Sequence, residues 1–419
     1  MTLVVPNRDT SPPRAIASVI GSMAMLAVSN GLLMAFVPLR LAAAGQASWV
    51  AGATVAAMGA GGLAACLVTG RVVRRVGHAR AFSAMVAGVI LSALAISLGT
   101  HLPLWIAARA LYGFAATSLF IISQSWLNDA CTNTWRGKVI ALFYMTYVVS
   151  LGCGGLLLRY VSLEGTAVPI LAVFFATLAI LPVSLTRLPT PPPPASISIA
   201  VGAVWQTSPV ALVGLLAAGG LTMLLSGFTP IYVTGEGYSR EEVGLLFFLM
   251  QLGLIAVQYP LGALSDRMDR RYTLIGSCAL VVIASLCAAA VDTERFALVA
   301  VVFAVWAGAT ESIYSIANAY ANDRAEPEFY VSLSSTLLVA WSLSSLVLPA
   351  VTTALMPLFG PATFIYMITL VATLYAVFVV FRLRRRDPVP AAETERYRQL
   401  SGQAPLGPEL GPVAEQKTP

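Results

Sequence analysis

Long apolar runs separated by short polar turns dominate the pattern of hydrophobic and polar positions in this 419-residue chain. A helix needs about 20 predominantly apolar residues to cross a bilayer. The runs therefore predict twelve membrane-spanning helices, near residues 15–41, 48–69, 80–99, 103–127, 138–159, 167–186, 208–232, 242–264, 273–291, 296–320, 330–354 and 361–381. Ten or eleven spans would require a merger at a short connection such as 100–102. The first run exceeds the apolar core of a signal peptide, so we expect it to be retained as a span.

Two basic turns between apolar runs divide the chain into similar parts. They are GRVVRRVGHAR, which begins at Gly70, and GALSDRMDRR, which begins at Gly262. A repeated feature of this kind indicates a repeated architecture. We expect an N-terminal tail (residues 1–14), a six-helix half (15–187), a linker (188–207), a second six-helix half (208–386) and a C-terminal tail (387–419). Prolines at 189 and 191–194 favour an extended linker, and the polar, proline-rich composition of the C-terminal tail favours disorder.

The composition of the chain predicts a membrane protein. The chain is 58% hydrophobic and only 11% charged, whereas soluble domains carry about 25% charged residues. Its net charge of +6 does not indicate nucleic acid, because the basic residues lie in short loops between the spans. Of the 25 lysine and arginine residues, 20 fall on the side of the two termini, and four fall on the other side: Arg40, Arg159, Arg240 and Arg295. The positive-inside rule then predicts cytoplasmic termini. We expect a multi-pass protein of the bacterial inner membrane.

Residues for catalysis or metal binding are scarce. The five cysteines show no CxxC spacing, and the chain has only two histidines. No nucleophile and base stand in a recognisable arrangement, so we expect neither an enzyme nor a metal or other cofactor. Glycine clusters such as Gly59, Gly61 and Gly62 favour close helix contacts over a phosphate site, because no strand precedes them and no Lys-Ser/Thr follows.

Two charges lie alone inside predicted spans, and both are candidates for proton coupling. Arg109 lies about six residues inside the fourth span, where a guanidinium is costly. It either faces a polar cavity or extends toward the interface, roughly 9 Å away at 1.5 Å per residue. Glu311 lies near the middle of the tenth span, where a carboxyl group favours its protonated form and could carry a proton. Alternatively, Glu311 is a neutral acid that is hydrogen-bonded to a neighbouring helix.

The basic turns and the fourth span resemble signatures of the Major Facilitator Superfamily of secondary transporters. The loop motif G-x-x-x-D-R-x-G-R-[KR] is matched by Gly262, Asp266, Arg267, Arg270 and Arg271. In its first copy Gly70, Arg75, Gly77 and Arg80 correspond, but Arg74 replaces the aspartate. The fourth span matches a second signature at Leu104, Arg109, Gly113 and Ala116. The stretches GRVVRRVG, QSWLN and IYSIANAYANDR further resemble the bacterial YcaD-like branch.

The resemblance implies a role for the loops and the spans. The two loops would gate the motion of the halves, although both could simply satisfy positive-inside topology, and Arg74 cannot make the aspartate contact. The first, fourth, seventh and tenth spans would line a central path. Polar candidates for its lining are Asn30, Tyr112, Gln124, Tyr144, Tyr147, Gln251, Gln258, Tyr314 and Asn318. Any one of them could instead form a helix–helix hydrogen bond, worth about 0.6 kcal/mol on average. The branch commonly has glutamate where Gln124 stands, and Gln124 cannot titrate.

The resemblance also implies an all-α membrane protein with twelve transmembrane helices in two pseudo-symmetric halves, each built of inverted three-helix repeats. The expected function is secondary transport of a small molecule by alternating access, coupled to a proton or another ion, with the lipid bilayer as surroundings and a monomer as working unit. Proton-coupled export of an amphipathic compound competes with uptake of a sugar or organic acid. A third alternative is a membrane scaffold or assembly factor that does not transport. A water-accessible central cavity would count against the third alternative, and a tightly packed interior would support it.

Overall fold

The computed structural model describes residues 13–99, 101–131, 133–186, 198–292, 294–326 and 329–384, together with Tyr397, Leu400 and Gln403. Regular structure in these ranges is helical. The first half contains α1 (Pro13–Ala43), α2 (Ser48–Val76), α3 (His78–Ser97), α4 (Leu102–Ala130), α5 (Asn133–Leu156), the 3-10 turn η1 (Leu157–Tyr160), α6 (Ala167–Leu178) and α7 (Ile180–Leu185). The second half contains α9 (Pro209–Gly235), α10 (Arg240–Ser265), α11 (Arg270–Ala290), α12 (Phe296–Asn322), α13 (Tyr330–Phe359) and α14 (Thr363–Leu383), and the short α8 (Val201–Thr207) precedes it.

Twelve helical segments in the described ranges are long and apolar enough to cross a membrane, and they confirm all twelve predicted spans. In the sixth span, α6 ends at Leu178 and α7 begins at Ile180. Pro182 explains this break, because it has no N–H to donate to the carbonyl of Leu178 four residues earlier. The two pieces together still form one span, Ala167–Leu185.

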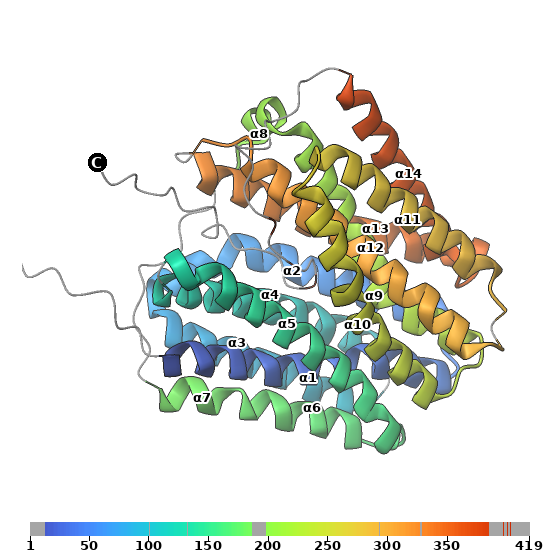
Figure 1. Ribbon diagram of the computed structural model, residues 1–419. Helices are drawn as coiled ribbons and strands as arrows, with labels where there is room; N and C mark the ends of the chain where they lie inside the picture. The colour runs from blue at the N-terminus through green and yellow to red at the C-terminus, as the bar shows by residue number, and fades with distance from the viewer. Residues whose placement is uncertain are drawn as a thin grey trace, which may run out of the picture.

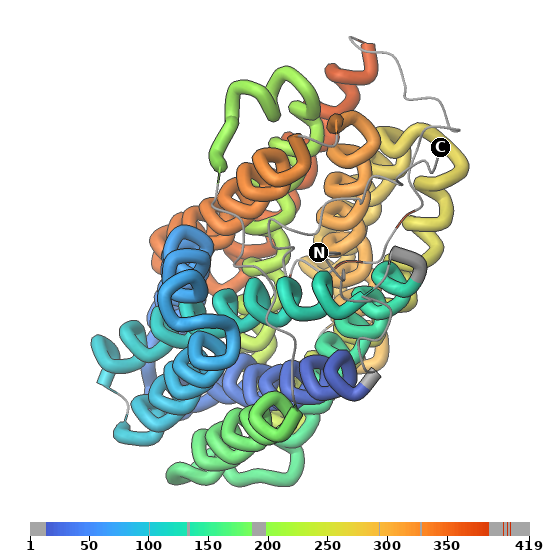
Figure 2. Tube along the Cα trace, turned by 90° about the vertical axis from the view of Figure 1, so that its left-hand side faces the viewer, coloured from blue at the N-terminus to red at the C-terminus, as the bar shows by residue number. Residues whose placement is uncertain are grey.

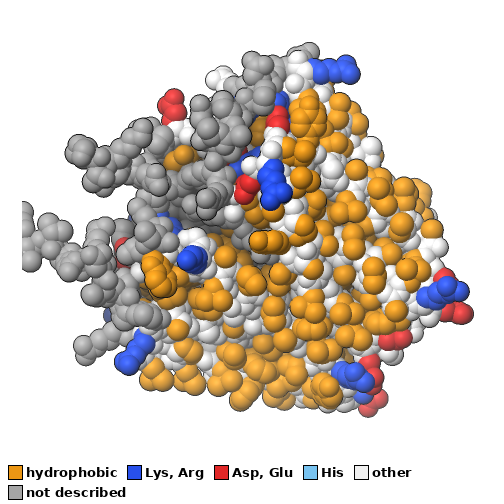
Figure 3. Space-filling model, viewed as in Figure 1, with side chains coloured by type: hydrophobic (Ala, Val, Ile, Leu, Met, Phe, Trp, Pro, Cys, Tyr) orange, Lys and Arg blue, Asp and Glu red, His pale blue; other side chains and the backbone are white. Residues whose placement is uncertain are grey.

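Apolar side chains cover the outside of the bundle. In α1 and α9 most of the span is buried, whereas α6–α7 and α14 are buried over only a third of theirs. The exposed large apolar residues include Leu91 on α3, Phe174 on α6, Leu286 on α11 and Leu374 on α14. Figure 3 shows a broad hydrophobic belt between two ends that carry charged residues. A contiguous apolar surface of this extent identifies a multi-pass membrane protein.

The two ends of the bundle differ in charge and in how the halves meet. We call the end at which α2 and α10 finish the basic end, because the arginines of both repeated loops lie there. It is the left side of Figure 1 and faces the viewer in Figure 2. At the opposite end the halves converge (Figure 1) and α5 contacts α10 directly. There Arg240 Nη1 donates a hydrogen bond to the carbonyl of Val161 at 3.1 Å, so the two halves are in direct contact at this end.

Two expectations about the connecting segments are wrong in part. Residues 201–207 of the predicted extended linker form α8, whose Val204 is fully buried; the prolines that favoured an extended chain lie outside the described residues. The composition of the C-terminal tail also predicts disorder throughout, yet Tyr397 and Leu400 pack against the core of the second half. Both departures have the same cause, since a few apolar side chains find a complementary surface on the helices. The predictions for the rest of the linker and tail lie outside the described residues.

Candidate functional site

Glu311 is held inside the second half by a contact between two central helices. Its side chain, on α12, is only 3% exposed. The Thr222 hydroxyl of α9 donates a hydrogen bond to Glu311 Oε1 at 2.8 Å. A buried carboxyl with a hydroxyl partner can be satisfied in either protonation state, because a hydroxyl both donates and accepts. The contact between α9 and α12 is therefore compatible with both the protonated and the deprotonated carboxyl group.

A polar stripe leads from Glu311 toward the basic end. Ser315 lies four residues further along α12, which places it on the same helix face about 6 Å away. Gln258 on α10 donates hydrogen bonds to the Glu311 carbonyl at 3.4 Å and to the Ser315 hydroxyl. Gln258 and Ser315 are both fully buried. The stripe thus joins α10 and α12 on the side of Glu311 that faces the basic end.

Arg109 is enclosed within the first half. Its side chain is 2% exposed, and Nη2 donates to the sulfur atoms of Met34 on α1 and Met58 on α2 at 3.2 and 3.1 Å. The guanidinium also lies 5.0 Å from the centre of the Tyr112 ring. Thioether sulfur is a weak acceptor. Among the described residues Arg109 Nε and Nη1 have no hydrogen-bond partner, so this buried cation is incompletely compensated.

Close packing of α4 on α2 fixes the place of Arg109. A Cβ atom added at Gly113 would lie 2.0 Å from the carbonyl oxygen of Met58. Glycine at this position therefore lets the two helices approach until Arg109 reaches Met58. The contact between α2 and α4 at Gly113 is thus a close helix–helix approach.

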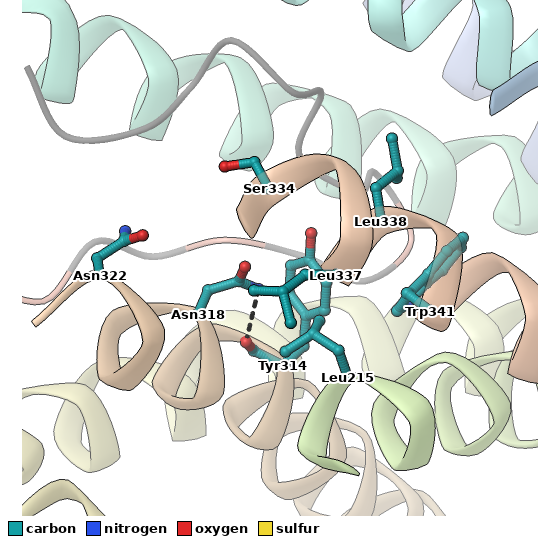
Figure 4. Close-up of a pocket in the computed structure, with 8 residues that line it drawn as sticks. All are labelled: Leu215, Tyr314, Asn318, Asn322, Ser334, Leu337, Leu338 and Trp341. Carbon is teal, nitrogen blue, oxygen red and sulfur yellow. Dashed lines mark hydrogen bonds between the residues drawn. The ribbon is translucent and has the colours of Figure 1, made fainter. Parts of the chain in front are cut away.

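The polar candidates for a path lining fall into small groups. In the first half Asn30 Nδ2 donates to the Tyr147 hydroxyl at 3.3 Å, and Gln124 Nε2 donates to the Tyr144 hydroxyl at 2.9 Å. In the second half Asn318 Nδ2 donates to the carbonyl of Tyr314 at 2.9 Å (Figure 4). Both residues line a small pocket of about 10 Å³ together with Leu215, Asn322, Ser334, Leu337, Leu338 and Trp341. This volume suits roughly one water molecule.

Gln251 occupies a different environment from the other candidates. It is buried on α10, where its aliphatic part packs against Gly152 of α5 at the interface between the halves. Its Oε1 has no hydrogen-bond partner among the described residues. Gln251 is thus a buried polar group at a contact that joins the halves.

A larger cavity of about 360 Å³ lies on the second half between α9, α13 and α14. It is open to the outside, and most of its lining is apolar, including Leu216, Leu343, Leu374 and Phe378. This composition suits the surrounding lipid and offers little to orient a polar ligand. The cavity is separate from Glu311 and Arg109.

The loop after α10 forms a network of charges at the basic end. Arg270 Nε lies 2.6 Å from Asp323 Oδ2, and its Nη1 lies 3.2 Å from Asp266 Oδ1. Asp269 caps α11 by accepting from the Arg271 N–H at 3.0 Å and pairs with the Arg271 guanidinium at 2.6 Å. Burial acts to raise the pKa of Asp269, but the hydrogen bonds and charge of Arg271 bring that pKa below its ordinary value.

The loop after α2 has a different make-up. Gly77 connects α2 to α3 with φ +81°, a backbone conformation that favours glycine. Arg71 Nη1 donates to the carbonyl of Leu67 at 3.3 Å, within its own helix. Arg74 stands where the second loop has Asp266, so the first loop carries a basic side chain at this position. The two copies of the motif are therefore similar in sequence but different in electrostatics.

A segment of the C-terminal tail completes the second loop's network. The backbone N–H of Tyr397 donates to Asp266 Oδ1 and Oδ2 at 2.8 and 3.1 Å. The carbonyl of Leu400 accepts from Ser315 Oγ at 2.8 Å and from Gln258 Nε2. Burial, reinforced by the negative charges of Asp266 and Glu311, raises the pKa of the Tyr397 phenol, so the ring is uncharged at neutral pH.

The structure brings some of the sequence-predicted residues together and keeps others apart. Glu311 and Gln258 share one polar stripe. Arg109 takes its contacts from α1, α2 and α4, whereas the hydroxyl partner of Glu311 comes from α9. Sequence reasoning missed Thr222, Met34, Met58, Asp323 and Ser315, together with the docked Tyr397 and Leu400. Only Asp323 offered a usable signal, as an acid beside an arginine at the end of a span.

The twelve membrane-spanning helices of the described ranges and the repeated basic loops point to a secondary transporter. The chain belongs to the Major Facilitator Superfamily, because the model of this family matches residues 19–241 and 210–414. It is 26% identical over 386 residues to the uncharacterized MFS-type transporter YcaD of Escherichia coli (strain SE11) and of Shigella sonnei (strain Ss046), covering 90% of this chain and 98% of each relative.

Two solved structures share the fold. The crystal structure of the nucleoside transporter NupG has a TM-score of 0.68 at 10% identity and covers 88% of this chain and 99% of its own. The crystal structure of the human organic anion transporter MFSD10 has a TM-score of 0.59 at 16% identity and covers 88% of this chain and 100% of its own. At these identities the likeness concerns the fold alone.

Proposed function

We propose that this transporter exports a small amphipathic compound in exchange for protons, with Glu311 as the proton-carrying group. The observation that supports this proposal most strongly is the buried carboxyl of Glu311, hydrogen-bonded to Thr222 between two central helices. An ionisable group at such depth is costly and is most often kept for transport of protons or ions. Protonation would make Glu311 neutral, and deprotonation would place a negative charge beside α9. The two forms would favour different arrangements of the halves.

Alternating access would follow from the contacts between the halves. The contacts at the opposite end, between α5 and α10, would open as contacts at the basic end form. We place the basic end in the cytoplasm of a bacterium, because the excess of Lys and Arg follows the positive-inside rule. The structure then corresponds to a state closed toward the outside.

Uptake of an organic acid is the second candidate, and Arg109 favours it. Its guanidinium is buried, and two of its nitrogen atoms have no hydrogen-bond partner among the described residues. An anion that reached Arg109 during transport would supply the missing acceptors. Arg109 would in that case bind cargo, whereas in the export mechanism it would act as a counter-charge.

Proton flux into sealed proteoliposomes distinguishes these proposals. The purified protein would be challenged with four probes: an amphipathic cation (ethidium), an organic anion (p-aminohippurate), a nucleoside (uridine) and a sugar (lactose). The second and third probes follow the two structural relatives, an organic anion transporter and a nucleoside transporter. Proton movement opposite to ethidium supports export by exchange, and movement together with an anion or sugar supports uptake.

The role of Glu311 needs a matched control. Glu311→Gln keeps the size and hydrogen bonding of the side chain but removes its proton chemistry, so it should abolish proton flux. Glu294→Gln makes the same change at an exposed position between α11 and α12 and should leave the flux intact. Proton flux that survives in Glu311→Gln would refute Glu311 as the proton carrier. A folded wild-type protein that moves none of the probes would favour the scaffold alternative.

A further inference from the structure

The most unexpected contact in the molecule lies between the C-terminal tail and the α10–α12 groove. Tyr397 and Leu400 are far in sequence from both helices, yet Leu400 is 7% exposed and the Tyr397 ring is packed over α10. Two helix residues, Gln258 and Ser315, and the C-cap residue of α10, Asp266, hold the tail through its backbone. A hydrogen bond to the tail replaces bonds to water, so its net gain is modest, but Gln258 and Ser315 are fully buried and each would lose a partner if the tail left.

Gly262 on α10 makes room for the ring of Tyr397. A Cβ atom added at Gly262 would lie 2.1 Å from Cε1 of Tyr397, so the tyrosine ring occupies the space that a side chain would need. The glycine that begins the loop motif therefore serves here as a seat for Tyr397. Asp266, four residues further along the chain, accepts the N–H of the same tyrosine. One residue of the tail thus contacts two positions of the loop motif.

The docked segment lies between Glu311 and the basic end. Ser315, which donates to the Leu400 carbonyl, follows Glu311 by one helical turn toward the basic end. Asn318 continues the same face of α12, and the small pocket that it lines has room for about one water molecule. A solute that approached Glu311 along this face would meet Leu400 first.

From these contacts we infer that Tyr397 and Leu400 form an autoinhibitory plug, which closes the basic-end access to Glu311. The inference rests on the proposed transport path past Glu311. It gives the tail a regulatory role: the plug must leave the groove before substrate or a proton can enter from the basic end. The tail also holds Asp266, so its release would free the loop motif for motion of the halves.

Trypsin measures the docking directly. The amide N–H that Asp266 accepts belongs to the bond between Arg396 and Tyr397, which is a trypsin site. We expect slow cleavage of this bond in the folded wild-type protein, measured as the released peptide by mass spectrometry. Tyr397→Ala and Gly262→Val should accelerate it by roughly tenfold or more, because cleavage follows the population of undocked tail. Gly262→Val leaves the cleaved sequence unchanged.

The control is Tyr259→Ala on α10, because Tyr259 is 71% exposed, whereas the residues that hold the tail are buried or half-buried. In this variant trypsin should cleave the bond between Arg396 and Tyr397 at the wild-type rate. Equal cleavage rates in wild type, Tyr397→Ala and Gly262→Val would overturn the docking of the tail.

Closure of the path needs a second measurement, labelling of Thr222→Cys by a charged maleimide in a background without the five native cysteines, because Thr222 contacts Glu311 and lies beyond Leu400 as seen from the basic end. Displacement of the tail by Gly262→Val should raise the labelling rate by roughly tenfold or more. Faster cleavage without faster labelling would show that the tail docks but does not close the path, and would overturn the plug. Neither readout requires transport. If the flux experiment fails while the variants still show faster trypsin cleavage and faster maleimide labelling, the result counts against the proposed function and leaves the plug intact.

Discussion

Gly244 offers a way to open the closed end of the transporter without touching its site. On α10 it lies against α5, and a Cβ atom added there would be 2.5 Å from the carbonyl oxygen of Gly155. The Gly244→Ala variant must therefore push α10 and α5 apart by roughly 1 Å to reach an ordinary contact distance. Overpacking of this kind costs about 1–3 kcal/mol. Because the contact joins the two halves, only the state that is closed at this end bears the cost.

The cost of the Gly244→Ala substitution sets how far the ratio of the closed and open states changes. A free-energy difference of about 1–3 kcal/mol between two states changes their ratio by roughly 5- to 150-fold. The gain in helix propensity on replacing glycine by alanine is present in both states and cancels. Gly276→Ala is the matched control, because a Cβ atom there meets nothing within 4 Å. It gains the same propensity without a clash.

Labelling of Val55→Cys would report the opening. Val55 is 5% exposed on α2, where it packs against Gly227 of α9 across the interface between the halves. In a background without native cysteines, a charged thiol reagent should label Val55→Cys roughly 5- to 150-fold faster in Gly244→Ala than in the parent. Gly276→Ala should label at the parent rate. Equal labelling in both variants would refute the reasoning that the Gly155–Gly244 contact belongs to one state only.

Three further predictions concern stability and charge. Gly113→Ala should lower the free energy of unfolding by about 1–3 kcal/mol, because its Cβ meets the Met58 carbonyl inside one half; an unchanged melting temperature would contradict this. Arg109→Met should leave stability unchanged or raise it by about 1–4 kcal/mol while abolishing substrate-driven flux, and a fully active variant would remove Arg109 from the mechanism. Asp269→Asn should cost about 1.5–3 kcal/mol at neutral pH through the pair with Arg271. The pKa of Asp269 is lowered from 3.8, so this contribution to stability is complete above pH 3.8. The difference in melting temperature between variant and wild type should shrink as the pH falls below that value. A difference that stays constant would disprove the assignment.

The spans were predictable because the bilayer sets the length of each apolar run. The same rule does not require a straight helix, and it would not have revealed the break at Leu178 without attention to Pro182. The repeated loops likewise indicated two halves. The sequence did not show that Asp269 would cap α11, because the motif has a glycine in that place.

The surroundings of the charged residues were much harder to predict. Met34 and Met58 look like ordinary core residues in the sequence, and only the packing of three helices brings their sulfur atoms to Arg109. The docking of Tyr397 depends on an empty space at Gly262 that arises from the shape of a folded helix. The composition of the tail predicts disorder, and a few apolar side chains with a complementary groove are enough to reverse this locally.

The most direct test of the central claim is the proton flux that a substrate gradient drives in sealed proteoliposomes, compared between the wild-type protein and Glu311→Gln. We predict a flux opposite to the substrate in the wild type and none in the variant, with the same melting temperature for both proteins. Equal proton flux in the two proteins would contradict the assignment of Glu311 as the proton carrier.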